Sequence, residues 1–158
     1  MNENYGKAIE VADKAHRGQK DLSGEPYFNH VERVIGGAIK LNLESGGAVN
    51  ADKLVCVAAL HDVVEDTDMT LEDLLEIGFS KEVVEAVDAI TKRAFTKESY
   101  EEYLDRVSKN KIATIVKIAD LKDNMDVTRF KRPLKSKDLY RVQKYHEAYL
   151  LLSEVLKG

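Results

Sequence analysis

The stretch "ADKLVCVAALHDVV", residues 51–64, is strongly apolar along most of its length. Its length and its apolar spacing predict an α-helix. A helix that is apolar on nearly all sides is normally buried among other elements. We therefore predict one helix over residues 51–64 at the centre of the fold. Within it, the single cysteine of the chain, Cys56, is expected to be a buried small hydrophobic side chain.

The segments on either side of this stretch also have helical periodicity, and strand signals are weak. In the N-terminal segment, for example, Tyr5, Ala8, Ile9, Ala12 and Ala15 fall on one face and are expected to point inward. Further helices are expected over residues 4–17, after Pro26, over 70–78, 80–90, 98–108 and 110–126, and from about residue 137. The sequence therefore predicts an all-α fold, a single domain over residues 1–158 with about seven to eight helices.

Composition and charge limit the possible function. The chain has 158 residues and a formal net charge of −4, which argues against a dedicated binder of nucleic acid or anionic membranes, because these partners require clustered Lys and Arg. A small anionic substrate needs only a local basic patch and remains compatible. We find no signal peptide and no apolar run of membrane-spanning length, and we predict a cytoplasmic protein whose oligomeric state the sequence leaves open.

The end of the apolar stretch carries a dense polar group. In "AALHDVVEDTDMT", residues 58–70, His61 and Asp62 are followed by Glu65 and Asp66. If the helix continues through them, all four side chains can face one cavity, because residues three and four apart are neighbours on a helix. The alternative is that these polar residues only mark the point where the helix reaches solvent.

Two distant residues favour a site over a solvated helix end. His30, in "PYFNHVERV", and Asp120, in "IVKIADLKDNMD", both lie among apolar residues, and a buried carboxylate needs a partner. With His61 and Asp62 they form a set of two imidazoles and two carboxylates. Such a set suits Mn²⁺, Fe²⁺ or Mg²⁺, whereas a closed structural Zn²⁺ site more often uses thiolates. The acidic pair left over, four residues further on, could orient a water molecule or transfer protons.

Four segments in order along the chain resemble the HD-domain hydrolases of the RelA/SpoT type, in particular the stand-alone small alarmone hydrolases. They are "AHRGQKDLSGEPYFNHVERV", "AALHDVVEDTDMTLEDL", "AVDAITKR" and "KIADLKDNMD". The His-Asp pair alone is weak evidence, but the combination of "HDxxEDT" with "GxPYxxH" upstream and "KxADxxxN" downstream is specific. "RVQKYHEAY" near the C-terminus also resembles these hydrolases. The resemblance covers most of the chain and implies a single HD-domain helical bundle.

This resemblance implies Mn²⁺-dependent removal of the 3′-pyrophosphate from ppGpp or pppGpp, giving GDP or GTP. Matched motif by motif, the metal ligands are His30, His61, Asp62 and Asp120. The catalytic acidic pair is Glu65 and Asp66. The implied substrate-binding residues are Lys20, Asn124, Arg141 and Tyr145.

Two departures from the family pattern remove positive charge where a nucleotide is expected to bind. Gln19 stands where an Arg is usual, and Asp126 replaces an Arg that often follows the motif asparagine. Lys92, Arg93, Lys97 or Arg129 could compensate from nearby loops. One alternative is therefore a phosphohydrolase acting on another nucleotide or on a phosphorylated cofactor such as NADPH. A second alternative is a metal-bound nucleotide sensor without turnover, although a pure binder has no need of the acidic pair.

Four other polar residues can be explained by ordinary structural roles. His16 and His146 lie outside the matched motifs, and we expect both to be ordinary, partly exposed helix residues. Ser23 is as compatible with a turn as with a phosphate contact. For Tyr145, stacking on a base and packing in an amphipathic helix are equally compatible with the sequence.

Overall fold

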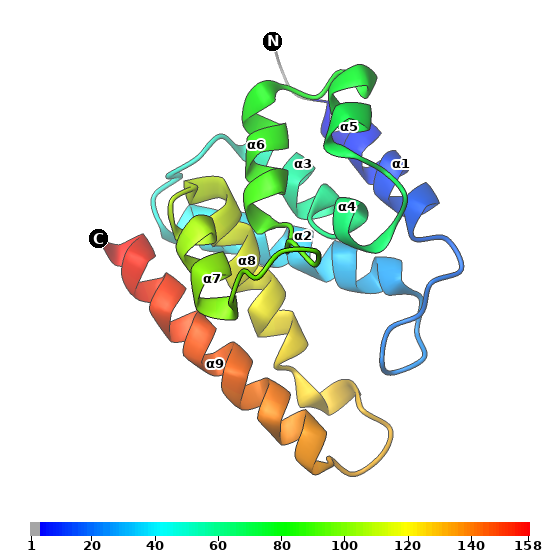
Figure 1. The fold of residues 1–158 in the computed structure, drawn as a ribbon, viewed down its shortest axis with the longest axis vertical. Helices are drawn as coiled ribbons and strands as arrows, with labels where there is room; N and C mark the ends of the chain where they lie inside the picture. Colours follow the sequence, from blue (N-terminus) through cyan, green and yellow to red (C-terminus); the bar gives the residue numbers. More distant parts are fainter. Residues whose placement is uncertain (1–3) are drawn as a thin grey trace.

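The computed structural model describes residues 4–158, which form helices joined by loops, with one isolated bridge between Lys20 and Pro26 (Figure 1). The α-helices are α1 (Tyr5–Ala15), α2 (Tyr27–Glu44), α3 (Ala51–Leu60), α4 (Val63–Asp66), α5 (Leu71–Ile77), α6 (Lys81–Ile90), α7 (Tyr100–Ser108), α8 (Lys111–Asn124) and α9 (Ser136–Lys157). A short 3₁₀ helix, η1, covers Val127–Arg129. Apart from the single turn α4, eight helices are present in the described chain, so the predicted all-α fold is confirmed.

Helix α3 lies at the centre of the bundle, as predicted. It packs against α1, α2, α6 and α8, which surround it (Figure 1). Six of its ten residues are buried: Leu54, Cys56, Val57, Ala58, Ala59 and Leu60. The apolar character of α3 on most sides is therefore explained by contact with helices in several directions.

The prediction of one helix over residues 51–64 is wrong at its C-terminal end. Helix α3 ends at Leu60, and the single turn α4 begins at Val63. Between them, Asp62 has φ −110° and ψ 0°, the bridge region of backbone space in which many active-site residues lie. The apolar pattern continues through Val63, which is fully buried, so the pattern does not reveal the break. Because the axis changes there, α4 presents its side chains in a new direction.

Helices α2 and α8 approach each other closely. A Cβ atom on Gly37 of α2 would lie 3.3 Å from the Cβ of Ala119 on α8, which is tighter than ordinary contact. Helix α2 begins directly after Pro26, whose ring restricts φ and suits a helix start. His30 lies in the first turns of α2, and Asp120 directly follows Ala119. The close contact of the two helices therefore brings two of the predicted ligands toward each other.

The predicted helix ends of the α5–α6 region are confirmed. Thr70 and Asp73 form a reciprocal capping box at α5, and Ser80 caps α6 through the backbone N–H of Val83. Gly78 ends α5 with φ 114°, a conformation that favours glycine. In α1, by contrast, the expected inward position of Tyr5 is wrong. The side chain is 51% exposed, because Tyr5 is the first helical residue and precedes the buried turn that begins at Ala8.

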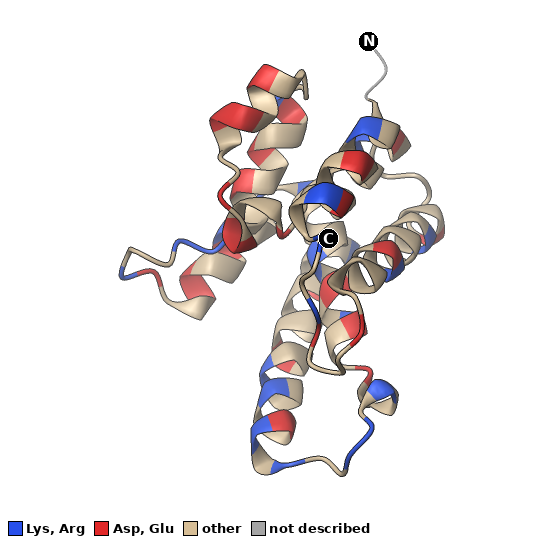
Figure 2. Cartoon of the chain, turned by 90° about the vertical axis from the view of Figure 1, so that its right-hand side faces the viewer, with Lys and Arg blue, Asp and Glu red and all other residues tan. Residues whose placement is uncertain are grey.

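The connection from α8 to the long helix α9 is organised by a buried carboxylate. Asp138 accepts hydrogen bonds from Arg132 (2.8 Å), from Arg141 (2.6 Å) and from the backbone N–H of Lys135 (2.7 Å). Lys and Arg residues follow this connection at the lower end of the molecule (Figure 2). No helix in the described part of the chain, α9 included, combines the length and the apolar character needed to cross a bilayer.

One arginine closes the loop between α6 and α7. Arg106 forms two hydrogen bonds with the carboxylate of Glu98, at 2.7 and 2.8 Å. It also donates to the backbone carbonyls of Asp88, Ala89 and Thr91, at 3.0 to 3.1 Å. A guanidinium can satisfy this planar set of acceptors, whereas an ammonium group cannot.

We predict that Arg106→Lys destabilises the fold by about 1–3 kcal/mol, because partly buried acceptors lose charged donors. Urea unfolding followed by circular dichroism measures this change. Arg93→Lys is the matched control, since Arg93 lies in the same loop and makes only one long ion pair, at 3.7 Å to Asp88. Equal unfolding midpoints for the two variants would contradict the prediction.

Candidate active site

The four predicted metal ligands meet at one point of the fold. His30 comes from α2, His61 follows the end of α3, Asp62 lies in the turn before α4, and Asp120 belongs to α8. Each offers one ligand atom, and these four atoms all lie within 4.8 Å of one another. His30, His61 and Asp120 are buried, and Asp62 is partly buried.

The two imidazoles turn the same nitrogen toward the centre of the cluster. His30 Nε2 lies 3.0 Å from Asp120 Oδ1, and His61 Nε2 lies 3.0 Å from Asp62 Oδ2. The other nitrogen of His61, Nδ1, lies 2.7 Å from the carbonyl oxygen of Ala58. A hydrogen bond from Nδ1 to that carbonyl leaves Nε2 with a lone pair, as a metal ligand requires.

Polar groups in the cluster fit a divalent cation. His61 Nε2 is buried and has no hydrogen-bond partner of good geometry. Burial lowers the pKa of His61, but the negative charges of the adjacent Asp62 and Asp120 outweigh burial and raise it well above its ordinary value. Imidazole and carboxylate groups at this spacing are a donor set that binds divalent ions. We conclude that the cluster is a candidate divalent metal centre.

Asp62 is held by two neighbours. The Tyr27 hydroxyl donates a hydrogen bond to Asp62 Oδ2, the oxygen that faces His61. Burial raises the pKa of Asp62, but the positive charge of His61 and its hydrogen bond lower the pKa to about 2. Asp62 is therefore an anion at neutral pH. Tyr27 belongs to the "PY" motif of the sequence analysis, although no role was predicted for it.

Asp120 is bound on both of its oxygens. Lys117 Nζ, itself buried, lies 2.9 Å from Asp120 Oδ2, and Asn124 Nδ2 donates to Oδ1 at 3.1 Å. Burial raises the pKa of Asp120, and Lys117 then lowers it well below its ordinary value. Asn124, predicted as a substrate residue, thus also positions a predicted ligand.

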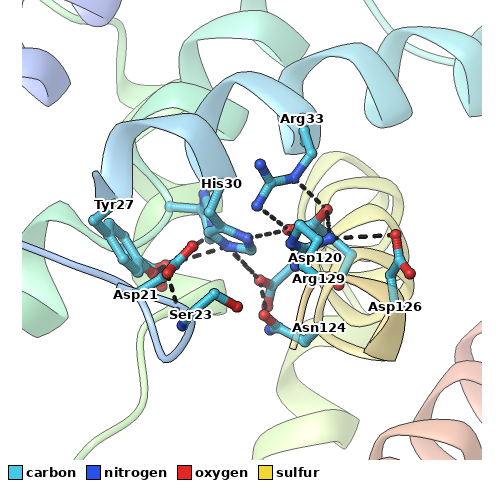
Figure 3. A network of polar contacts seen from close by, with 12 residues as sticks. Asp21, Ser23, Tyr27, His30, Arg33, Asp120, Asn124, Asp126 and Arg129 are labelled. Atoms are coloured by element: carbon cyan, nitrogen blue, oxygen red, sulfur yellow. Dashed lines mark hydrogen bonds and ion pairs between the residues drawn. The ribbon is translucent and has the colours of Figure 1, made fainter. Parts of the chain in front are cut away.

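Asp123 is a functional candidate that sequence reasoning missed. Its Oδ2 lies 2.6 Å from His30 Nδ1, so it can orient the ring and turn Nε2 toward the cluster. Arg33 binds Asp123 at 2.7 Å, and Arg129 approaches it at 3.3 Å. Figure 3 shows Arg33 and Arg129 in the polar network beside His30. The signal was its spacing, because Asp123 lies one turn after Asp120 on the same helix face.

The acidic pair lies beside the cluster on α4. Glu65 Oε1 accepts a hydrogen bond from the backbone N–H of Lys92, at 2.8 Å, which connects α4 with the loop after α6. Asp66 has a raised pKa of about 6, caused first by burial and then by the negative charges of Asp62 and Glu65. A carboxyl group with this pKa can exchange a proton close to neutral pH.

The expectation that His16 is partly exposed is wrong, whereas His146 is exposed. His16 is only 2% exposed, because its ring packs against the ring of Tyr27 at a centroid distance of 4.8 Å. Its Nδ1 lies 2.8 Å from the side-chain oxygen of Gln19. Gln19, which stands where the family usually has an arginine, therefore contacts this buried histidine.

The predicted substrate residues line two adjoining cavities. A cavity of about 320 Å³ is bordered by Lys20, Asn124 and His30. A smaller cavity of about 90 Å³ is bordered by Asn124, Arg141 and Tyr145. Because Asn124 borders both, we treat the two cavities as one groove and call it the main groove. Its wall also contains Leu22 and Phe130 in both cavities, and Arg33 and Arg129 in the larger one.

Comparison with known proteins agrees with this geometry. Residues 8–128 match the model of a family described as HD domain. The chain is 33% identical over 143 residues to a guanosine-3′,5′-bis(diphosphate) 3′-pyrophosphohydrolase of Vibrio cholerae, which covers 83% of this chain and 19% of that protein. It is 40% identical over 86 residues to a probable enzyme of the same name from Mycoplasma pneumoniae, covering 54% of this chain and 11% of that protein. The chain thus spans less than a fifth of these relatives.

A solved structure covers nearly the whole chain. It is described as a metazoan orthologue of SpoT that hydrolyses ppGpp, and it matches with a TM-score of 0.71 and 26% identity. The match covers 98% of this chain and 85% of that one, so the similarity extends beyond residues 8–128 to include α9.

We predict that Asp123→Asn weakens binding of a divalent ion by about tenfold, since groups that orient a ligating imidazole typically contribute this much. Titration of the metal-free protein with Mn²⁺, followed by calorimetry, measures the affinity. Asp126→Asn is the matched control, because Asp126 is exposed, contacts Thr128 and Arg129, and does not touch His30. Unchanged affinity in Asp123→Asn would show that Asp123 does not position His30.

Asp66→Asn is predicted to stabilise the metal-free protein at pH 8. The folded protein binds the Asp66 proton with a pKa of about 6, above the ordinary value of 3.8, so this group favours folding below about pH 4 and loses that effect as the pH rises through 6. Because the group is only partly shielded from water, solvent screening reduces the expected gain to about 1 kcal/mol. Unfolding in urea should show the gain at pH 8 and a smaller one toward pH 4.

The exposed Asp68 provides the control for this measurement. Asp68→Asn should change the unfolding midpoint little at either pH. A gain for Asp66→Asn that stays constant between pH 8 and pH 4 would argue against a raised pKa.

Proposed function

The chain belongs to the HD domain family, and from this premise we propose that it hydrolyses the 3′-pyrophosphate of ppGpp or pppGpp, giving GDP or GTP and pyrophosphate. The observation that carries the proposal is the buried cluster of two histidines and two aspartates next to an acidic pair and a groove. Names of similar proteins support it, since the Vibrio cholerae relative is called a 3′-pyrophosphohydrolase of this nucleotide. Residues 1–158 would act as one domain.

His30, His61, Asp62 and Asp120 are the proposed ligands of the ion, which we take to be Mn²⁺, with Fe²⁺ or Mg²⁺ as alternatives. When bound, such an ion lowers the pKa of a water molecule and offsets the charge of a phosphate group. The protein prepares this site in three ways. Asp123 orients His30, Tyr27 holds Asp62, and Lys117 holds Asp120.

Glu65 and Asp66 are the proposed proton-transfer groups. In the reaction, the oxygen of water bonds to the phosphorus attached to the ribose 3′ oxygen, and the bond between that phosphorus and the 3′ oxygen breaks. One carboxylate of the pair accepts the proton of the water, and the pair then returns a proton to the departing 3′ oxygen. A pKa of about 6 for Asp66, raised mainly by burial, suits both the uptake and the release of this proton.

The main groove is the proposed binding site of the nucleotide. Lys20 and Arg141 supply positive charge, Asn124 supplies an amide, and Tyr145 supplies a ring on which a base can stack. We propose that Arg33 and Arg129, in the wall of the larger cavity, supply part of the positive charge of the arginines missing from the family pattern, although both also contact Asp123. The proposed partner is therefore a small anionic nucleotide and not a nucleic acid. The predicted location of the protein is the cytoplasm.

The proposal is tested with purified protein, Mn²⁺ and ppGpp, measuring GDP and pyrophosphate. We expect both products in equal amounts. Asp62→Ala should reduce turnover at least about 100-fold, because removing a ligand costs more than removing a group that only orients one. Asp68→Ala, an exposed aspartate six residues later, should keep activity.

A parallel series of substrates separates this function from its alternatives. If ppGpp gives neither product, and NADPH or another phosphorylated compound releases orthophosphate, ppGpp is not the substrate and that compound takes its place. Tight binding of ppGpp without turnover under Mn²⁺ would indicate a sensor and overturn the proposed hydrolysis.

A further inference from the structure

A second cavity lies beside Glu65 of the acidic pair, outside the main groove. It has a volume of about 350 Å³ and is bordered by Glu65, Lys92, Tyr100, Tyr103 and Lys144. These residues come from α4, from the loop after α6, and from α7 and α9. We call it the Lys92 cavity. None of the predicted substrate residues borders it, but Glu65, a proposed proton-transfer group, does.

Aromatic rings hold two ammonium groups at this cavity. Lys144 Nζ lies 4.2 Å from the centre of the Tyr100 ring. Lys92 Nζ lies 5.6 Å from the centre of the same ring and 5.9 Å from that of Tyr103. Contacts at these distances are cation–π interactions, which orient a lysine without neutralising its charge. The lysines therefore remain available to an anion.

Positive charge is in excess around the cavity. Its wall contains three basic side chains, Lys92, Arg93 and Lys144, and two acidic ones, Glu65 and Glu98. Glu98 binds Arg106, and Glu65 accepts a hydrogen bond from the backbone N–H of Lys92. Among the described residues, no carboxylate lies within 4.0 Å of the ammonium group of Lys92 or of Lys144. Partial burial lowers the pKa of Lys92, and the positive charges of Lys117 and Lys144 lower it further, while the negative charge of Glu65 raises it. An anion between these groups would relieve their repulsion.

The Lys92 cavity also has a hydrogen-bond donor without an acceptor among the described residues. The hydroxyl of Tyr100 is buried and has no hydrogen-bond partner among the described residues. A buried polar group without a partner is unfavourable, so such groups are rare unless a ligand satisfies them. A phosphate oxygen could accept this hydrogen bond and the bonds of both ammonium groups.

We propose that Lys92, Lys144 and Tyr100 form a phosphate-binding subsite for a phosphate group of the substrate that water does not attack. The assignment of this phosphate to a substrate rests on the proposed function, because Glu65 joins the subsite to the reacting groups. A substrate with two diphosphate groups offers two sources. One is the outer phosphate of the departing pyrophosphate, and the other is the 5′-diphosphate that remains on the nucleoside.

The experiment uses calorimetry to measure binding of inorganic pyrophosphate and of GDP to the metal-loaded protein. We expect Lys144→Met to weaken binding of one probe by about tenfold, as loss of one charge-assisted contact does. Weaker binding of pyrophosphate alone assigns the subsite to the departing group, and weaker binding of GDP alone assigns it to the 5′-diphosphate. Lys144→Arg should keep most of the affinity. Lys137→Met, which removes an exposed lysine from the same helix, should match the unchanged protein.

Tyr100→Phe separates a binding role from a structural one. Because the hydroxyl has no partner in the fold, its removal should leave the unfolding midpoint unchanged or raise it. Binding of the same probe should nevertheless weaken about threefold or more. Unchanged binding of both probes in Lys144→Met and in Tyr100→Phe would overturn the subsite. If binding weakens as expected but ppGpp is not hydrolysed, the subsite stands and the proposed function fails.

Discussion

Two carboxylates and two imidazoles share one small buried space, and the balance of charge among them is the constraint on which the surrounding structure depends. Their four ligand atoms lie within 4.8 Å of one another, a spacing at which unbalanced charges are strongly unfavourable. Neighbouring residues of opposite charge stabilise the charged groups of this cluster. The buried Lys117 forms an ion pair with Asp120, and the partly buried Asp123 lies between His30 and Arg33. The helices that carry these side chains are consequently restricted in how they can pack.

Much of the fold and the core of the site could be predicted from the sequence. Helix caps such as Thr70 with Asp73 depend on hydrogen bonds between residues close in sequence, so the sequence pattern alone is enough to predict them. The meeting of His30 with Asp120 could also be predicted, because polar residues among apolar neighbours need partners. A resemblance to known hydrolases indicated which residues those partners are. The structure brings them together, while their roles as ligands remain a proposal.

Other features depend on contacts between distant segments and left no clear local signal. The break at Asp62 is hidden because Val63 continues the apolar pattern across it. His16 is buried by the ring of Tyr27, eleven residues later, so its own helix pattern could not reveal its position. The spacing of Asp123 places it one turn after Asp120, but it does not reveal that Arg33, ninety residues earlier, lies beside it. In each case the tertiary environment, and not the local propensity, decides the outcome.

The close contact between Gly37 and Ala119 has a consequence for the stability of the whole protein. This contact and the His30–Asp120 pair join the same two helices, α2 and α8. An ion that draws His30 and Asp120 together also presses the helices onto each other, so ion occupancy and helix packing are thermodynamically linked. A larger side chain at Gly37 would act against the ion from a position outside its coordination sphere. The proposed metal centre would therefore also connect α2 with α8, and depletion of the ion would be expected to loosen the packing of these two helices.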